Sequence, residues 1–420
     1  MKNKSISRQF GKCIMLLFWL TCLIVTVFLV SCGESDNHTV SSQETGSEAQ
    51  PSVIPVEVSL SDSEMEVGIC TVHEIKAAGG ERIAWNSSDN AVATVDADGK
   101  ITGVSAGECD VIARNEFGKT ARCHIVVKKS VFITIDDGPF NNCGSILRAL
   151  KNNDVKATFF VVRTHDIAMI RRIHEEGHYV GLHTYSHEFA KCYRNEYSYY
   201  AGLEKLKVIV REYTGETPDI IRFPGGTGNL RMDWIGMRRM VSGLDDLGYR
   251  AFDWTASAGD AEKEPITYYK AAANVLRDCR KDVNIVLMHD KETTANAIGV
   301  IVPTLRERDY TFDTLDHYAE HSYRSNSVYE RYRGDAVIPC TEIILDSNEI
   351  SLMPQKSAQL TATMVPDNTT DYLRFLSDDP SVASVTLEGM ITGIRPGTTH
   401  IRAIASSGAE AVCTVKVAQE

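Results

Sequence analysis

Aspartate and histidine occur as closely spaced pairs in the middle of this 420-residue chain. The stretch ITIDDGPF ends a strand-like run with Asp136 and Asp137, and the stretch HTYSH places His183 and His187 four positions apart. Two imidazoles and one carboxylate can hold a zinc-like ion and leave coordination positions open for water and substrate. We therefore expect Asp137 and the two histidines to bind a metal, while Asp136 stays off the metal and acts as a general base.

Three further stretches carry groups that could assist this chemistry. RFPGG contains Arg222, whose cation would offset the repulsion between the two neighbouring carboxylates. LMHD contains His289, which must be protonated to give a proton to a leaving group, and Asp260, six positions after Trp254, could favour that form and orient the ring. Each residue taken alone has an ordinary explanation as a surface group, an ion pair or a structural histidine.

The elements that carry these residues must bring them together. Between about residues 130 and 318, apolar strand-like runs alternate with helix-like runs, which predicts repeated βα units and a mostly parallel sheet or barrel. Active sites of such folds lie at the carboxyl ends of the strands. Five of six successive predicted strands end in a titratable or donor group, and packing alone does not explain that joint placement. The sequence therefore predicts a single active site at this edge.

The segment 132–315 resembles the polysaccharide deacetylase family, also called the NodB-homology or carbohydrate esterase 4 family, whose fold is a distorted (β/α) barrel. The family patterns T-[FY]-D-D-G-P, H-[ST]-x-x-H, R-x-P-x-G and L-x-H occur here in order, as TIDDGP, HTYSH, RFPGG and LMH. The resemblance implies that Asp136 is the base and that the metal ligands are Asp137, His183 and His187. The implied metal is divalent, usually Zn²⁺.

The same resemblance assigns roles to the remaining residues. The implied catalytic residues are Asp136, His289, Arg222 and Asp260, and the implied substrate-binding residues are Pro224, Gly225, Gly226 and Trp254. Arg222 restrains the base, and backbone N–H groups near the glycines stabilise the oxyanion together with the metal. The chain departs from the family pattern at Ile135, Gly225 and Ala261, where aromatic residues are usual or frequent. Less aromatic surface in the groove makes the sugar harder to predict.

Two stretches that begin at Trp85 and Phe375, 290 residues apart, are copies of one another. Each alternates short strands with Asp-Gly or Glu-Gly turns, which predicts a small β-sandwich. The copies resemble the group 2 bacterial immunoglobulin-like domain, which binds carbohydrate or acts as a spacer, and the lack of an evident aromatic platform favours a spacer. We expect a multidomain chain, with a central α/β distorted (β/α) barrel flanked by two small all-β immunoglobulin-like sandwiches.

The N-terminus has the pattern of an export signal. Four cations in the first 12 residues precede an uncharged apolar run, and Leu29-Val30-Ser31-Cys32 resembles a bacterial lipobox, an uncleaved transmembrane anchor being the alternative. Either leaves the remainder outside the cytoplasmic membrane, and the first predicts a lipoprotein anchored through Cys32 to its outer face. The predicted boundaries are 1–31 for the signal peptide, 32–54 for a flexible linker, 55–128 and 340–420 for the Ig-like domains, 129–320 for the deacetylase domain and 321–339 for a second linker.

Charge and cysteine content argue against some classes of partner and of metal site. The net charge is −12 and would become −16 without the four N-terminal cations, which argues against a nucleic-acid partner. Eight cysteines lie beyond Cys32 and none forms a Cys-x-x-Cys pair, which argues against a thiolate zinc site. Eight cysteines allow 105 disulfide connectivities, so none is assigned.

The expected activity is hydrolysis of N-acetyl groups on amino sugars of a glycan, with cell-wall peptidoglycan first and chitin-like oligomers second. Two alternatives remain open from the sequence. The same base, metal and acid would serve an O-acetyl esterase acting on xylan, although an alkoxide leaves more easily and would depend less on His289. The second alternative is a catalytically inactive lipoprotein that binds carbohydrate or serves in adhesion. The complete set of ligands, base and acid argues against this alternative.

Overall fold

The computed structural model describes residues 56–164, 166–229, 231–232, 234–261, 264–323, 328 and 338–419. The predicted signal peptide, Cys32 and the linker 32–54 lie outside the described residues, as does most of the linker 321–339. Among the residues that the structure describes, no helix combines the length and apolar character needed to cross a membrane.

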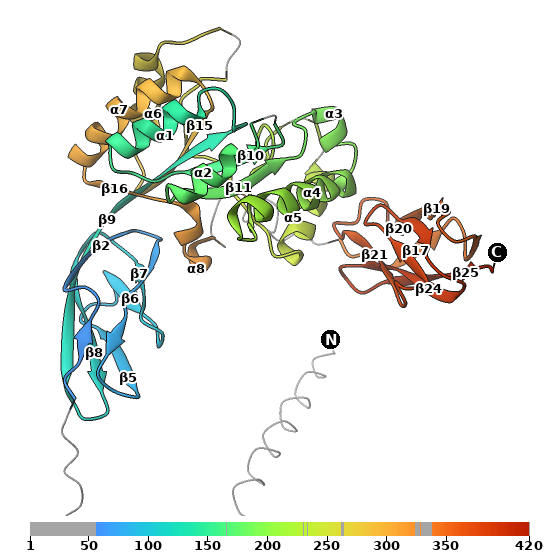
Figure 1. Ribbon diagram of the computed structural model, residues 1–420, viewed down its shortest axis with the longest axis horizontal. Helices are drawn as coiled ribbons and strands as arrows, with labels where there is room; N and C mark the ends of the chain where they lie inside the picture. Colours follow the sequence, from blue (N-terminus) through green and yellow to red (C-terminus); the bar gives the residue numbers. More distant parts are fainter. Residues whose placement is uncertain are drawn as a thin grey trace, which may run out of the picture. The chain divides into compact units, whose positions relative to one another are not determined.

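The central domain is built on parallel strands that run in the order β13-β12-β11-β10-β9-β15-β14, with β16 also paired to β9. Figure 1 labels β9, β10, β11, β15 and β16 of this sheet. The strands are β9 Thr120–Asp136, β10 Thr158–Val162, β11 Tyr179–Thr184, β12 Ile220–Ile221, β13 Arg250–Ala251, β14 Ala256–Ser257, β15 Val283–His289 and β16 Tyr310–Asp313. The predicted fold class, a distorted (β/α) barrel within a multidomain chain, is confirmed by this parallel sheet, by the helices between its strands and by the all-β regions on either side of it in the sequence.

Helices follow the strands and bury their apolar faces against the sheet. They are α1 Cys143–Asn152, α2 Met169–Glu175, α3 Phe189–Cys192, α4 Glu196–Thr214, α5 Trp234–Asp246, α6 Tyr268–Asp278, α7 Glu292–Glu307 and α8 Glu320–Tyr323, with the 3-10 helix η1 at Leu315–His317. The longest, α4, is capped at its N-terminus by Asn195, whose side chain accepts from the backbone N–H of Ser198, and at its C-terminus by Gly215 with φ of 78°. These local signals fix both ends of the helix that packs behind the histidine-bearing strand β11.

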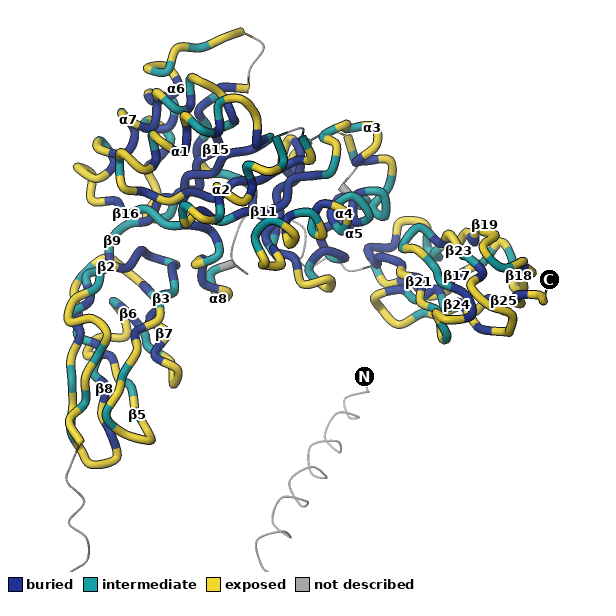
Figure 2. Tube along the Cα trace, viewed as in Figure 1, coloured by how far each residue is buried: buried dark blue, intermediate teal, exposed yellow. Residues whose placement is uncertain are grey.

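Strand β9 belongs to two domains at once. Its first half alternates exposed and buried residues in the Ig-like sheet, whereas its second half, SVFITID, is buried almost throughout (Figure 2). This change follows the sequence, because a strand with one solvent-facing side alternates and a strand covered on both sides is continuously apolar. The boundary predicted between residues 128 and 129 therefore falls inside a continuous strand.

The two Ig-like regions share one order of strands, and the matching strands lie 290 residues apart from Ile83 and Leu373 onward. The first contains β1 Ser59–Leu60, β2 Glu64–Gly68, β3 Val72–Glu74, β4 Ala77–Ala78, β5 Ile83–Ser87, β6 Ala93–Val95, β7 Lys100–Gly103, β8 Gly107–Asn115 and the start of β9. The second contains β17 Glu342–Leu345, β18 Glu349–Leu352, β19 Ser357–Gln359, β20 Ala362–Val365, β21 Leu373–Ser377, β22 Ala383–Val385, β23 Met390–Gly393, β24 Gly397–Ala405 and β25 Glu410–Val417.

The repeat extends to backbone detail. Gly99 and Gly389 both have φ of 82°, and a Cβ at either position would meet a backbone carbonyl and one aromatic ring, Trp85 in the first copy and Phe375 in the second. A side chain at either glycine would need both an unfavourable φ and the space of that ring. The eight described cysteines form no disulfide.

Candidate active site

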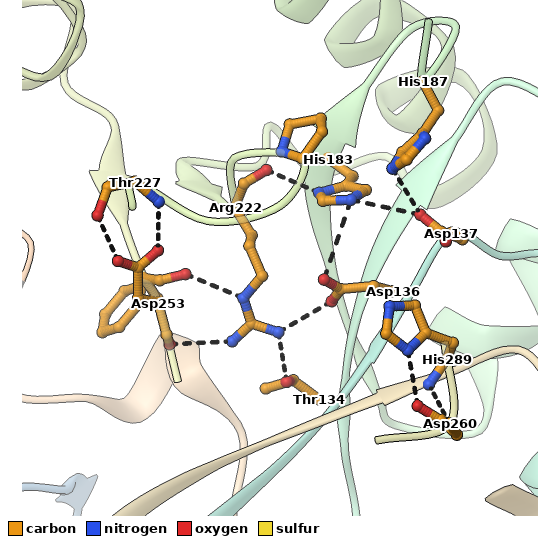
Figure 3. Close-up of polar contacts among 12 residues, drawn as sticks. Thr134, Asp136, Asp137, His183, His187, Arg222, Thr227, Asp253, Asp260 and His289 are labelled. Carbon is orange, nitrogen blue, oxygen red and sulfur yellow. Dashed lines mark hydrogen bonds and ion pairs between the residues drawn. The ribbon is translucent and has the colours of Figure 1, made fainter. Parts of the chain in front are cut away.

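The general-base candidate Asp136 ends strand β9 and is 3% exposed. Its Oδ1 lies 2.9 Å from Nη1 of Arg222, and its Oδ2 lies 3.9 Å from Nε2 of His183. Figure 3 shows this carboxylate between the arginine and the histidine. One oxygen is therefore held by a cation, while the other faces the predicted metal ligands.

Arg222 is fully buried and its donors are distributed around the base. Nε donates to the carbonyl of Phe252 at 2.9 Å, Nη2 donates to the carbonyl of Asp253 at 3.2 Å, and Nη1 also donates to the Thr134 hydroxyl. The guanidinium carbon lies 4.2 Å from the ring centroid of Phe160. A buried cation needs such partners because its desolvation is costly, and the same contacts fix the position of Asp136.

The three predicted metal ligands lie together, with both histidines facing one carboxylate oxygen of Asp137. Nε2 of His183 and Nε2 of His187 lie 3.3 and 3.1 Å from the same oxygen, Oδ1 of Asp137. This Oδ1 is buried and has no hydrogen-bond partner among the described residues. Asp137 and His187 both have positive φ, 72° and 51°, which is uncommon for residues other than glycine and is concentrated at functional sites.

His183 is held in the orientation that a metal ligand needs. Its Nδ1 donates to the carbonyl of Arg222 at 2.7 Å, which leaves the lone pair of Nε2 directed toward Asp137. The Tyr199 hydroxyl lies 3.2 Å from the carbonyl of His183 and 3.4 Å from that of Arg222, and so ties the two strand ends together. The neighbouring backbone thus supports the ligand as well as the base.

The donor set fits a divalent cation of the zinc class. Two imidazole nitrogens and one carboxylate suit such an ion, and a cation would satisfy the otherwise unpartnered Oδ1. Burial alone would raise the pKa of Asp137, but the close approach of His183 and the positive charges that His183, His187 and His289 carry when protonated outweigh burial, so this pKa is well below its usual range. Burial lowers the pKa of His187, which favours the neutral ring that can ligate a metal.

The predicted acid lies on the neighbouring strand β15, where His289 is aligned with Asp136 of β9. Its Nδ1 lies 2.8 Å from Oδ1 of Asp260, and its backbone N–H donates to the other oxygen at 2.9 Å. Burial alone would lower the pKa of His289, but the hydrogen bond with Asp260 and the charges of Asp136, Asp260 and Asp137 outweigh it and raise that pKa. The protonated form that an acid catalyst requires is therefore favoured.

The predicted substrate-binding loop runs between two aromatic rings. Gly225 and Gly226 have φ of 73° and 70°. A Cβ on Gly226 would lie 2.9 Å from the ring of Trp254, and one on Gly225 would lie 3.4 Å from the ring of Phe189. Pro224 is held through its carbonyl, which accepts from the Tyr193 hydroxyl at 2.7 Å. Glycine at both positions allows the backbone to pass closely between these rings.

Comparison with known proteins agrees with this arrangement. Residues 125–250 match the polysaccharide deacetylase family, and residues 71–125 and 339–415 match the bacterial Ig-like domain (group 2). A peptidoglycan-N-acetylglucosamine deacetylase of Bacillus cereus is 32% identical over 220 residues, which cover 50% of this chain and 77% of that protein. The chain belongs to the polysaccharide deacetylase family.

Two further proteins that resemble this polysaccharide deacetylase are also named as deacetylases. A chitin deacetylase of Colletotrichum lindemuthianum is 30% identical over 201 residues, which cover 44% of this chain and 77% of that protein. The crystal structure of the catalytic domain of a peptidoglycan N-acetylglucosamine deacetylase from Eubacterium rectale is 35% identical, with a TM-score of 0.43, and the match covers 45% of this chain and 89% of that one. The relatives from Bacillus cereus and Colletotrichum lindemuthianum, matched by sequence, support a deacetylase enzyme.

Several residues of the deacetylase site were not singled out from the sequence. Thr134 accepts from Arg222 and donates to the carbonyl of Val286, and Asp253 accepts from the backbone N–H of Thr227 beside the glycine loop. Asp290 accepts from the backbone N–H groups of Phe140 and Asn142, and so holds the loop that follows Asp137. The sequence contained a signal for two of these residues, because Asp290 directly follows His289 and Thr134 begins the TIDDGP stretch.

Proposed function

We propose that this polysaccharide deacetylase removes N-acetyl groups from amino-sugar residues of a glycan, with peptidoglycan as the first substrate and chitin-like oligomers as the second. The observation that carries the proposal is the position of Asp136 between Arg222 and the three candidate ligands, with His289 aligned on the next strand. The names of the relatives, which include peptidoglycan and chitin deacetylases, support the amide substrate.

The proposed cofactor is Zn²⁺ held by Asp137, His183 and His187. When bound, such an ion polarises a carbonyl oxygen and makes a water acidic enough to lose its proton near neutral pH. Asp136 is placed to accept that proton through Oδ2, because Oδ1 is already engaged by Arg222. The fixed hydrogen bond also prevents the base from turning away from the water.

Expulsion of the amine requires a proton, which His289 is placed to supply. Asp260 holds Nδ1 of this ring, so Nε2 is the nitrogen left to face the substrate. Backbone N–H groups in the loop around Gly225 and Gly226 would stabilise the developing oxyanion, and Trp254 beside Gly226 would form one wall of the groove.

We further propose that the chain is exported and attached through Cys32 to the outer face of the bacterial cytoplasmic membrane. The cationic start, the apolar run and the lipobox-like LVSC support this proposal. Such an anchor would bring the catalytic domain near cell-wall peptidoglycan. Radiolabelled lipid incorporation into the wild-type chain but not into Cys32→Ala would test it.

The decisive experiment measures acetate released by the full chain from N-acetylglucosamine oligomers, peptidoglycan and acetylated xylan. We expect release from an amide substrate, lost with a chelator, restored by zinc, and reduced at least about 100-fold in Asp136→Asn, the range that general-base removal gives. Asp98→Asn, an exposed aspartate of the Ig-like region, is the matched control. Release from xylan alone would favour the esterase, and no release from zinc-loaded protein would contradict the proposed activity.

A further inference from the structure

A second group of metal-ligating side chains lies away from the active site, where the first Ig-like region meets the central domain. It consists of His73 on β3, Asp313 at the end of β16 and His317 in η1. Nε2 of His73 lies 2.8 Å from Oδ2 of Asp313, and Nδ1 of His317 lies 2.7 Å from Oδ1 of the same carboxylate. Each residue can offer one ligand atom, and these atoms all lie within 4.8 Å of one another.

Backbone contacts between the two parts of the chain build this cluster. Thr71 and Tyr318 form an antiparallel bridge, and the backbone N–H of Ala319 donates to the carbonyl of Cys70 at 2.8 Å. His73 lies two residues beyond the bridge on one side, and His317 lies one residue before it on the other. The histidines therefore meet because the bridge joins the Ig-like region to the segment that follows β16.

The second cluster has the composition of the first and a similar distance between its imidazole rings, although its two histidines face different oxygens of the aspartate. Each contains two histidines and one aspartate, and the imidazole centroids are 4.9 Å apart for His73 and His317 and 5.1 Å apart for His183 and His187. A buried carboxylate oxygen without a hydrogen-bond partner in the described part of the chain occurs at both places: Oδ1 of the ligand Asp137 at the first and, beside the second cluster, Oδ1 of Asp316, which is not one of its three members. Unpartnered buried oxygens are rare enough to need an explanation, and a bound ion is one.

The position and charge of Asp316 connect that oxygen to the cluster. Its other oxygen, Oδ2, lies 3.7 Å from Nε2 of His317. With neutral imidazoles, the carboxylates of Asp313 and Asp316 leave two negative charges, which match one divalent cation. The side chains of His73, Asp313 and His317 are 27%, 13% and 44% exposed, so an ion can enter from solvent.

We propose that His73, Asp313 and His317 bind a second divalent cation of the zinc class, with Asp316 adding a negative charge beside His317. Because the ligands come from the Ig-like region and from the central domain, the ion would fasten one to the other. None of these three residues belongs to the group of base, acid and metal ligands at the active site. The site therefore contributes stability rather than chemistry.

The test is metal content. The full chain is stripped with a chelator, reloaded with zinc chloride, separated from free metal and analysed by atomic emission. We expect two zinc ions per wild-type chain, one in His73→Gln/His317→Gln and one in Asp137→Ala. The double variant His174→Gln/His400→Gln changes two histidines outside both clusters and should keep two zinc ions. Acetate release should persist in His73→Gln/His317→Gln, because neither residue belongs to the catalytic site.

A second measurement isolates the new site. In an Asp137→Ala background, zinc should raise the melting temperature, and His73→Gln added to that background should abolish the shift. The single substitution lies at a partly exposed strand position and serves if the double variant does not fold. One zinc ion in the wild-type chain, with no zinc-dependent shift in Asp137→Ala, would show a hydrogen-bonded triad without metal. Two zinc ions in both wild type and the double variant would also overturn the assignment.

Discussion

His289 and Asp260 are joined twice, once through the ring and once through the backbone. Nδ1 of the histidine lies 2.8 Å from Oδ1 of the aspartate, and the backbone N–H donates to Oδ2 at 2.9 Å. The hydroxyl of Thr294 also donates to Oδ2, at 2.7 Å. The carboxylate is thereby fixed in place and kept charged, which its lowered pKa reflects although burial alone would raise that pKa. Its charge in turn favours the imidazolium.

Asp260→Asn should move the basic limb of the pH–rate profile to lower pH. The acid catalyst must be protonated to act, so the rate falls as pH rises through the pKa of His289. The asparagine oxygen can still accept from Nδ1, but the lost charge lowers that pKa, and we expect the limb to shift by about one pH unit. Acetate release across pH checks this, with the acidic limb as internal control. A uniform loss of rate without a shift would assign Asp260 a purely structural role.

Arg222→Ala should destabilise the central domain as well as reduce the rate. The substitution leaves the buried carboxylate of Asp136 without its cation, and breaking a buried pair in this way costs about 3–5 kcal/mol. Urea unfolding followed by fluorescence measures the change in the free energy of unfolding. Arg374→Ala, which alters an exposed arginine of β21, should change that free energy by less than about 0.5 kcal/mol. Equal losses in both variants would contradict a special role for the buried pair.

The sequence indicated the predicted reactive groups that the structure brings together, but it did not indicate the residues that support them. Two aspartates, a spaced histidine pair and a strand-end histidine have types and spacings that indicate metal chemistry, so the residue pattern alone was enough to select Asp137 and His187. Tyr199 and Asp253 could not be selected in this way, because a tyrosine within a helix and an aspartate after a short strand are ordinary in sequence. Their contacts with the backbone of His183 and with Thr227 arise only when strands distant in the chain become neighbours.

The fold, too, was predicted from the sequence only in part. Alternating strand-like and helix-like runs predicted the βα units, and the 290-residue repeat predicted two equivalent sandwiches. The shared strand β9 was not foreseen, since a change from alternating to continuous apolar residues marks a change of environment and does not by itself reveal that the strand continues through it. The same limitation hid the His73–Asp313 contact, whose partners are 240 positions apart.

Asp137→Asn should weaken zinc binding at the active site while leaving the backbone unstrained. Asparagine tolerates the positive φ of 72° as well as aspartate does, so the substitution removes the ligand charge alone. We expect zinc affinity to fall by at least about 10-fold, as for loss of groups that tune a metal site, and acetate release to require excess zinc. Competition with a zinc-binding dye measures the affinity. Unchanged affinity together with unchanged activity would remove Asp137 from the ligand set.

Gly226→Ala tests whether the loop beside Trp254 is shaped for the substrate groove. The new methyl group would meet both an unfavourable φ of 70° and the tryptophan ring at 2.9 Å. Gly215→Ala is the matched control, because Gly215 has φ of 78° and nothing within 4 Å of the added Cβ. Backbone strain of about 1 kcal/mol should be common to the two variants. Any further loss in Gly226→Ala reports the displacement of the ring.

Two measurements on each variant separate these effects: the KM for glycan oligomers and the free energy of unfolding. Gly215→Ala should lower stability with an unchanged KM, because it ends helix α4 away from the groove. Gly226→Ala should raise the KM several-fold in addition, since moving Trp254 removes a stacking surface for the sugar. If both variants lose stability equally and neither changes the KM, the tryptophan packs against the loop only to support it, and the groove wall must be sought elsewhere.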